Sequence, residues 1–160
     1  MFYSLAADRV GTIVPTLSYS VILAHMTAFA LLFTLAAIGL AETSYLIRKR
    51  RAGQHAVCVI GNGCGAVLES AYRRTLGVYN DVLGFVFYAA MMLVTALAVT
   101  RAFPTASGLE LALITRAMLL AAVLMTLRFV YLQWRVIKTW CFWCLMSAAT
   151  IGLMVLVIII

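Results

Sequence analysis

Four cysteines carry the most distinctive chemistry of this sequence, and two of them, Cys141 and Cys144, form a CxxC motif. Thiols three positions apart lie on one side of a helical turn, close enough to form a disulfide after a small local adjustment. The motif opens an apolar run that reaches Ile160 without a charged residue. Because a helix N-terminus favours an anion, Cys141 should ionise more readily than a free cysteine. The motif therefore predicts a redox-active pair at the mouth of a membrane-buried helix, rather than two inert buried cysteines.

The other two cysteines, Cys58 and Cys64, lie in a loop that is rich in glycine. Gly61, Gly63 and Gly65 permit the tight backbone that brings these two thiols together, since glycine adopts positive φ angles at little cost. A pair on a loop can reach a protein in water, whereas a pair at the membrane boundary can reach a molecule dissolved in lipid. Exchange between the two pairs would form a relay. A quinone is the natural lipid-soluble acceptor, because it takes two electrons as a dithiol gives two.

Two other interpretations of the cysteines remain open. Four thiolates with one CxxC motif half-resemble a structural zinc site, although the second half is C-x5-C in a glycine loop. A purely structural role is the other alternative. Metal content and quinone turnover distinguish these alternatives from a redox relay, and the predicted site contains no metal.

The composition is that of an integral membrane protein. Of the 160 residues, 66% are hydrophobic and 11% are charged, whereas soluble domains contain about 45–50% apolar and about 25% charged residues. The apolar runs are long and continuous, which favours spanning helices over the alternating pattern of a β-barrel. The net charge of +7 points to contact with lipid headgroups and does not imply nucleic-acid binding.

The hydropathy pattern predicts one all-α membrane domain over residues 1–160, built as a four-helix bundle. The expected spans are residues 18–47, 82–103, 109–133 and 141–160. A tight turn is expected between the second and third spans, at Pro104, Thr105, Ser107 and Gly108.

The first connection, residues 48–81, is the cysteine loop, and it should contain a short helix lying in the membrane interface. After Cys64, the residues Val67, Leu68, Ala71 and Tyr72 form an apolar stripe with i, i+4 spacing, as in a helix at the interface. Because four spans place this loop and the third connection on the same membrane surface, both cysteine pairs are expected there.

Further residues accompany the cysteines in a specific pattern. Val67, Leu68 and Ser70 follow Cys64, then Asn80 precedes Leu83, Gly84, Phe85, Phe87 and Tyr88, and Phe142 and Trp143 separate Cys141 from Cys144. With this pattern, over about residues 58–144, the chain resembles the vitamin K epoxide reductase family. That family includes prokaryotic members that couple disulfide formation to quinone reduction.

The resemblance implies a role for each cysteine and a set of quinone-binding residues. Cys58 would meet the partner protein, Cys64 would exchange with Cys141, and Cys144 would face the quinone. Asn80 would donate its amide to a quinone carbonyl, and Ser70 would line the pocket. The implied quinone-binding set is Asn80, Ser70, Cys144, Leu68, Phe87 and Tyr88.

Each of these polar and aromatic residues also has a plainer interpretation. Asn80 could cap the second span, together with Asp81. Ser70 could bond a backbone carbonyl, and Phe87 and Tyr88 could serve as core packing.

Two departures from the family pattern limit the inference. Animal members have a tyrosine four positions after the second cysteine of the motif, where this chain has Ala148. A quinone is therefore expected as substrate in preference to the epoxide, with strict quinone or epoxide reduction as the alternative. Many bacterial members carry a fused thioredoxin-like domain, and here none follows Ile160. The expected electron donor is therefore a separate thioredoxin-like protein.

The basic residues predict an orientation in the membrane. The surface with both cysteine pairs carries Arg48, Lys49, Arg50, Arg51, Arg73, Arg74, Arg135 and Lys138, and the other carries Arg9 and Arg101 with Arg116 nearby. The positive-inside rule places the richer surface in the cytoplasm. A cytosolic disulfide-forming site is expected on this basis, as in hyperthermophiles that make intracellular disulfides. The alternative is an extracytoplasmic site, with the arginines gripping lipid phosphates.

Overall fold

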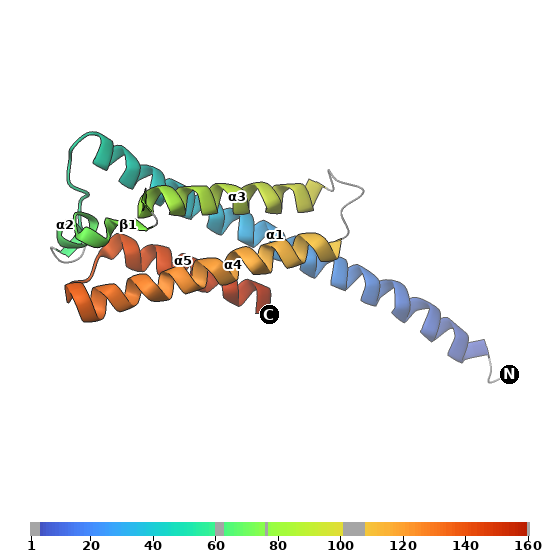
Figure 1. The fold of residues 1–160 in the computed structure, drawn as a ribbon. Coiled ribbons are helices and arrows are strands. Elements are labelled where there is room, and N and C mark those ends of the chain that lie inside the picture. Colours follow the sequence, from blue (N-terminus) through green and yellow to red (C-terminus); the bar gives the residue numbers. More distant parts are fainter. Residues whose placement is uncertain (1–3, 60–62, 76, 101–107, 160) are drawn as a thin grey trace.

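Long helices dominate the structure, which is a computed structural model describing residues 4–59, 63–75, 77–100 and 108–159. The four long helices are α1 (Ser4–Arg51), α3 (Asn80–Thr100), α4 (Gly108–Tyr131) and α5 (Phe142–Ile159). They run side by side as a bundle, and the N-terminal part of α1 extends beyond it (Figure 1). The shorter elements are α2 (Gly63–Leu68), the 3-10 helix Ala71–Arg73, the strands β1 (Arg74–Thr75) and β2 (Val78–Tyr79), and the π-helix Leu132–Ile137.

Four segments of these helices are long and apolar enough to cross a membrane. They are Met26–Arg51, Asn80–Val99, Glu110–Ile137 and Phe142–Ile159, with 26, 20, 28 and 18 residues, where a span needs about 20. Large apolar side chains on the outside of the bundle, such as Leu93, Leu120 and Leu124, are 61–63% exposed, as suits a surface that faces lipid. The predicted all-α bundle with four spans is confirmed, and the chain is a multi-pass membrane protein.

The helix boundaries differ from the predicted ones at several points. Helix α1 begins at Ser4, well before the predicted start of the span. The third span continues past α4 into the π-helix Leu132–Ile137, so its helical segment ends later than the predicted residue 133. The turn predicted around Pro104 lies outside the described residues.

The interior of the bundle is small and is centred on Tyr88. The buried cluster comprises Leu32, Ala36, Tyr88, Met91, Leu119, Ala122, Ile151 and Met154. The Tyr88 ring lies so close to Gly39 that any side chain there would overlap it. The absence of a side chain at Gly39 therefore allows α1 and α3 to pack closely, which fixes one wall of the site.

The predicted short helix of the cysteine loop is present, but its bounds were wrong. Helix α2 begins at Gly63, includes Cys64 and ends at Leu68, whereas the apolar stripe predicted a helix reaching Tyr72. The Ser70 hydroxyl donates to the carbonyl of Val67 over 2.8 Å, and such local bonds compete with the continuation of a helix. The chain then turns through the 3-10 helix and the hairpin β1–β2, in which Arg74 pairs with Tyr79.

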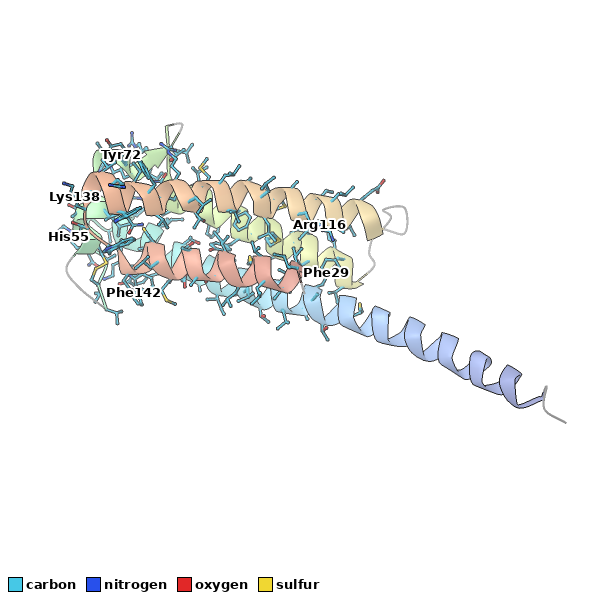
Figure 2. All side chains as sticks on the ribbon, turned by 90° about the horizontal axis from the view of Figure 1, so that it is seen from below. Phe29, His55, Tyr72, Arg116, Lys138 and Phe142 are labelled. Atoms are coloured by element: carbon cyan, nitrogen blue, oxygen red, sulfur yellow. A yellow bond between two sulfur atoms is a disulfide. The ribbon has the colours of Figure 1, made fainter. Side chains whose placement is uncertain are left out.

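One end of the bundle carries the loop, α2 and the start of α5. His55, Tyr72 and Lys138 lie at this end in Figure 2, with Phe142 beside it, whereas Phe29 and Arg116 lie towards the other end. The end with the loop is therefore the end at which both cysteine pairs meet, as the count of four spans predicts.

Candidate functional site

The two loop cysteines form a disulfide. Cys58 and Cys64 are bonded, with their Cα atoms 5.9 Å apart, and the backbone N–H of Cys64 donates to the Cys58 sulfur over 3.1 Å. Cys64 is buried in the first turn of α2, whereas Cys58 is half-buried in a segment without regular structure. The predicted pairing is confirmed, and the more accessible sulfur is Cys58.

The residue before Cys58 ties the loop to two helices. The Trp143 ring N–H donates to the carbonyl of Val57 over 2.9 Å, and the N–H of Val57 donates to the Tyr45 hydroxyl over 3.2 Å. The rings of Tyr45 and Trp143 also pack together, with centroids 4.8 Å apart. Trp143 lies inside the CxxC motif, and Val57 directly precedes Cys58. This hydrogen bond therefore connects the loop at Cys58 to the turn that carries the second cysteine pair.

The second pair, Cys141 and Cys144, is in the thiol form. Cys141 immediately precedes α5, and its carbonyl accepts the N–H of Leu145 over 3.1 Å, so it occupies the N-cap of this helix. Its sulfur accepts the backbone N–H groups of Trp143 and Cys144, the donors that an N-cap side chain normally satisfies. The predicted position at a helix start is confirmed.

Gln133 holds the turn that leads into the motif, and sequence reasoning missed it. Its side-chain oxygen accepts the N–H of Cys141 over 2.8 Å, and its carbonyl accepts the N–H of Thr139 over 3.1 Å. Lys138 between them takes a left-handed conformation, with φ of 54°. The signal available in the sequence was a glutamine at the end of an apolar span, because polar groups inside membrane spans usually have a specific task. In the structure Gln133 is 2% exposed.

Hydrogen bonding favours the thiolate of Cys141. The thiol of Cys144 is the main cause and the N–H groups of Cys144 and Trp143 add to it, lowering the pKa of Cys141 to about 7 against the opposing effect of burial. Below this pH the thiol form dominates, and above it the thiolate does. Thiolate is the reactive form in disulfide exchange, so Cys141 is poised to attack near neutral pH.

An ultraviolet titration of the thiolate should show this ionisation. The titration is carried out with the loop disulfide closed, and the absorbance of Cys141→Ser is subtracted from that of the wild-type chain. This difference in thiolate absorbance should rise with increasing pH, with a midpoint near pH 7. Cys144→Ala, which removes the main donor, should move the midpoint upwards. A wild-type midpoint at the ordinary cysteine value of about 8.5 would contradict the assignment.

The segments that carry the two cysteine pairs are in contact at Gly63. A Cβ atom at Gly63 would overlap the side chain of Thr139 and the carbonyl oxygen of Trp140. Gly63 directly precedes Cys64, and Trp140 directly precedes Cys141. The bare backbone of α2 therefore lies against the turn that leads into Cys141, and the residues next to Cys64 and Cys141 are in contact.

A cavity of about 760 Å³ lies within the bundle below the loop. Its wall includes residues of α1, α3, α4 and α5 as well as the loop, and its volume is within the usual range of about 300–1,000 Å³ for small-molecule sites. Of the four cysteines, Cys144 lines the cavity and the other three do not. A ring-shaped molecule in this cavity could therefore contact the sulfur of Cys144 but not those of the other three cysteines.

The structure brings the residues of the implied quinone-binding set together around this cavity. Asn80, Ser70, Leu68, Phe87 and Tyr88 all line it, as does Cys144. Their roles towards a ligand stay predictions.

The polar members of this set already have protein partners. The Asn80 amide N–H donates to the Tyr72 carbonyl over 2.8 Å, and its oxygen accepts the Thr75 hydroxyl over 2.8 Å. Asn80 therefore fastens the hairpin to the start of α3. The Ser70 hydroxyl donates to Val67, as in its plainer interpretation, and Tyr88 is both a core residue and part of the wall.

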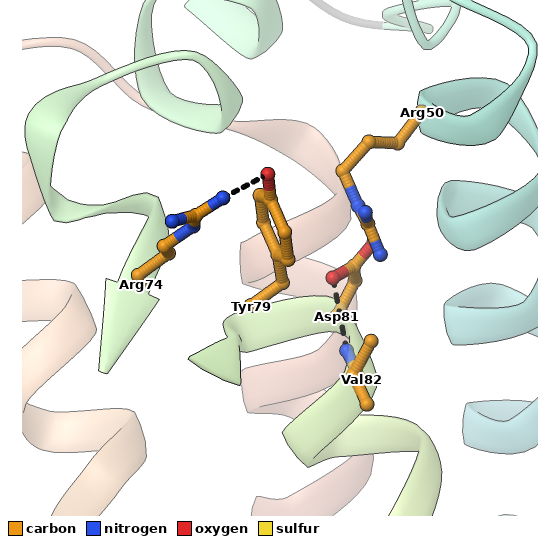
Figure 3. Close-up of polar contacts among 5 residues, drawn as sticks. All are labelled: Arg50, Arg74, Tyr79, Asp81 and Val82. Carbon is orange, nitrogen blue, oxygen red and sulfur yellow. Dashed lines mark hydrogen bonds and ion pairs between the residues drawn. The ribbon is translucent and has the colours of Figure 1, made fainter. Parts of the chain in front are cut away.

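Charged residues join three elements at the rim of the cavity. Arg50 at the end of α1 pairs with Asp81 of α3 over 2.7 Å, and its guanidinium lies 3.8 Å from the ring centre of Tyr79. Arg74 donates to the Tyr79 hydroxyl, as Figure 3 shows, and this bond lowers the pKa of that phenol. The Asp81 carboxylate also accepts the N–H of Val82 over 2.9 Å. The cluster joins the end of α1 to the hairpin and to the start of α3.

Metal binding has no support within the described residues. No group of three histidine, cysteine or acidic side chains there lies close enough to hold an ion, and two of the four thiols are joined in the loop disulfide. The arrangement is instead that of two dithiol–disulfide pairs beside a cavity.

Comparison with known proteins agrees with this arrangement. A model of the Vitamin K epoxide reductase family matches residues 30–159, a range that includes all four cysteines and the cavity residues. No curated protein gives a significant match to the chain. Because the family match extends over most of the sequence, this chain belongs to the vitamin K epoxide reductase family of membrane oxidoreductases.

Proposed function

We propose that the protein is a membrane thiol oxidase that passes electrons from a reduced thioredoxin-like protein to a membrane quinone. The observation that carries the proposal is the position of Cys144, which lines a cavity of about 760 Å³, while the residue before its partner Cys141 lies against Gly63, the residue before Cys64. Electrons can thus leave water-exposed sulfur and reach a lipid-soluble ring within one small region.

The reaction divides into three two-electron steps. A donor dithiol attacks the Cys58–Cys64 disulfide, becomes oxidised and leaves two loop thiols. These thiols reduce a Cys141–Cys144 disulfide through a bond between Cys64 and Cys141, which restores the loop disulfide. Finally Cys141 and Cys144 form their disulfide as the quinone takes two electrons and two protons to become a quinol. A closed loop disulfide with free helix thiols corresponds to the moment before the last step.

The cavity wall favours a quinone over an epoxide as substrate. Ala148 lines the cavity and offers no polar group to an epoxide oxygen. Asn80 contributes an amide whose second N–H is not needed for Tyr72, so it can donate to a ring carbonyl in our proposal.

The basic end of the bundle supports a cytoplasmic active site. Arg48, Lys49, Arg50 and Arg51 end α1, and Arg73, Arg74, Arg135 and Lys138 lie at the same end. Under the positive-inside rule this end faces the cytoplasm. A reporter fused within the loop, active only outside the membrane, should therefore give no signal, and a signal would place the site on the extracytoplasmic side.

The loop cysteines provide the test of the proposed electron path. With a quinone analogue as acceptor, Cys58→Ser and Cys64→Ser should lose most activity with a reduced thioredoxin-like donor, since that donor cannot enter the cavity. The same variants should keep much of their activity with dithiothreitol, which is small enough to reduce Cys141 and Cys144 directly. Quinone absorbance reports both reactions. Equal losses with the two donors would contradict the order of the relay, and bound zinc without turnover would support the metal alternative.

A further inference from the structure

One carboxyl oxygen in the cavity wall is buried without a hydrogen-bond partner among the described residues. Glu42 lies in the Met26–Arg51 span of α1, and its Oε2 atom is buried with no hydrogen bond to any described residue. The side chain is part of the wall of the same cavity as Cys144. Ionisable groups within membrane spans are costly and usually functional, and the bonds of the fold leave this one unexplained.

Glu42 stands at one end of a row of groups that can exchange protons. Gly39, one helical turn before Glu42, lies against the end of the Tyr88 ring that carries the hydroxyl, and Glu42 interacts electrostatically with this phenol. The Tyr88 hydroxyl is 2.8 Å from the Ser147 hydroxyl. Ser147 lies three residues after Cys144 in α5, on the same side of that helix. Glu42, Tyr88, Ser147 and Cys144 all line the same cavity, and together they form the row from α1 through α3 to α5.

The proposed reaction requires protons as well as electrons at the ring. When Cys141 and Cys144 form a disulfide, two electrons and two protons leave the thiols, and the quinone needs both protons on its carbonyl oxygens. A carboxyl group in the cavity wall can deliver a proton to the ring directly. We infer that Glu42 is the proton donor to one quinone carbonyl and is recharged with the proton of one thiol through Ser147 and Tyr88, while the proton of the other thiol goes to the second carbonyl. This inference rests on the function proposed above.

The other charged groups near Glu42 are less suited to this task. Asp81 on α3 is held by Arg50, and Lys49 and Arg50 lie two turns further along α1, at the rim. Tyr88 on α3 and Cys144 on α5 are the remaining titratable groups of the spanning helices in the cavity wall, and both belong to the row itself. Glu42, with its buried and unpartnered Oε2 atom, is thus the carboxyl that can gain and lose a proton beside the ring.

The test compares three substitutions in the complete protein in lipid nanodiscs, with a short-chain ubiquinone analogue as probe. Glu42→Gln keeps the shape but cannot exchange a proton, and it should slow single-turnover quinone reduction by about 10²–10⁴-fold, the usual contribution of a general acid. Glu42→Asp, which keeps a carboxyl group, should recover much of the rate. Glu110→Gln, at the start of α4 at the opposite end of the bundle, is the matched control and should behave as wild type.

Binding and infrared measurements separate a proton donor from a structural carboxyl. The dissociation constant for the analogue should be nearly the same in Glu42→Gln and wild type, and a wild-type rate or a purely weakened affinity would overturn the inference. The infrared difference spectrum between thiol and disulfide forms should contain a carboxyl band that shifts in Glu42→Asp, a readout that survives if Glu42→Gln does not fold. A spectrum without such a band would also overturn it. Absence of quinone reduction in wild type would overturn the proposed function itself.

Discussion

Replacing Cys144 with serine is expected to abolish quinone reduction with every electron donor. Cys144 is the one cysteine of the four that lines the cavity, and a serine hydroxyl cannot form the disulfide whose two electrons the quinone receives. The loss should be complete with dithiothreitol and with a thioredoxin-like protein alike. The assay follows quinone absorbance with the purified variant in lipid nanodiscs.

The loss should come without a change in fold. Serine is close to cysteine in size and the site is only half-buried, so the helical circular dichroism and the thermal unfolding midpoint should stay near those of wild type. Turnover by Cys144→Ser at a rate comparable with wild type would show that the ring is reduced elsewhere.

The second large effect is expected from a side chain at Gly63. A Cβ atom there would overlap Thr139 and the carbonyl of Trp140, so Gly63→Val should push α2 away from the turn that carries Cys141. Overpacking of this kind typically costs about 1–3 kcal/mol, which corresponds to a roughly 5–150-fold loss of the docked arrangement. Reoxidation of the loop thiols by the helix pair should slow by a similar factor, as followed by quenching with an alkylating reagent.

Gly65 gives the matched control for this substitution. It lies two residues later on the same short helix, and a Cβ atom there would have no neighbour within 4 Å among the described residues. Gly65→Val should therefore exchange at nearly the wild-type rate. Quinone reduction by dithiothreitol, which bypasses the loop, should persist in both variants. Equal exchange rates in Gly63→Val and Gly65→Val would show that the contact does not govern transfer between the pairs.

Much of this architecture could be predicted because it follows from the local composition of the chain and from the number of membrane spans. Long apolar runs identify the spans, and four spans necessarily bring residues 58–64 and 141–144 to one surface. The bounds of the loop helix could not be predicted from its apolar stripe. The Ser70 hydroxyl donates a hydrogen bond to the carbonyl of Val67, and this bond ends the helix before the stripe does.

The contacts that join the site could not be predicted from spacing. The contact of Gly63 with the turn before Cys141, and the bond from Cys141 to Gln133, connect residues that are far apart or unremarkable in the sequence. The cavity residues were implied by family resemblance and not by any periodicity. The unpartnered oxygen of Glu42 could not be predicted either, since hydropathy does not report whether a carboxyl group has a hydrogen-bond partner.

The most direct test of the relay is a stoichiometric titration of the wild-type protein. Chains with the loop disulfide closed and Cys141 and Cys144 reduced are mixed anaerobically with increasing amounts of a quinone analogue, and quinol and remaining thiols are both counted. The account predicts one quinol for each chain, the loss of two thiols, and a new disulfide that peptide mapping assigns to Cys141 and Cys144. Quinol formed without that disulfide, or unchanged thiols in the presence of excess quinone, would contradict it.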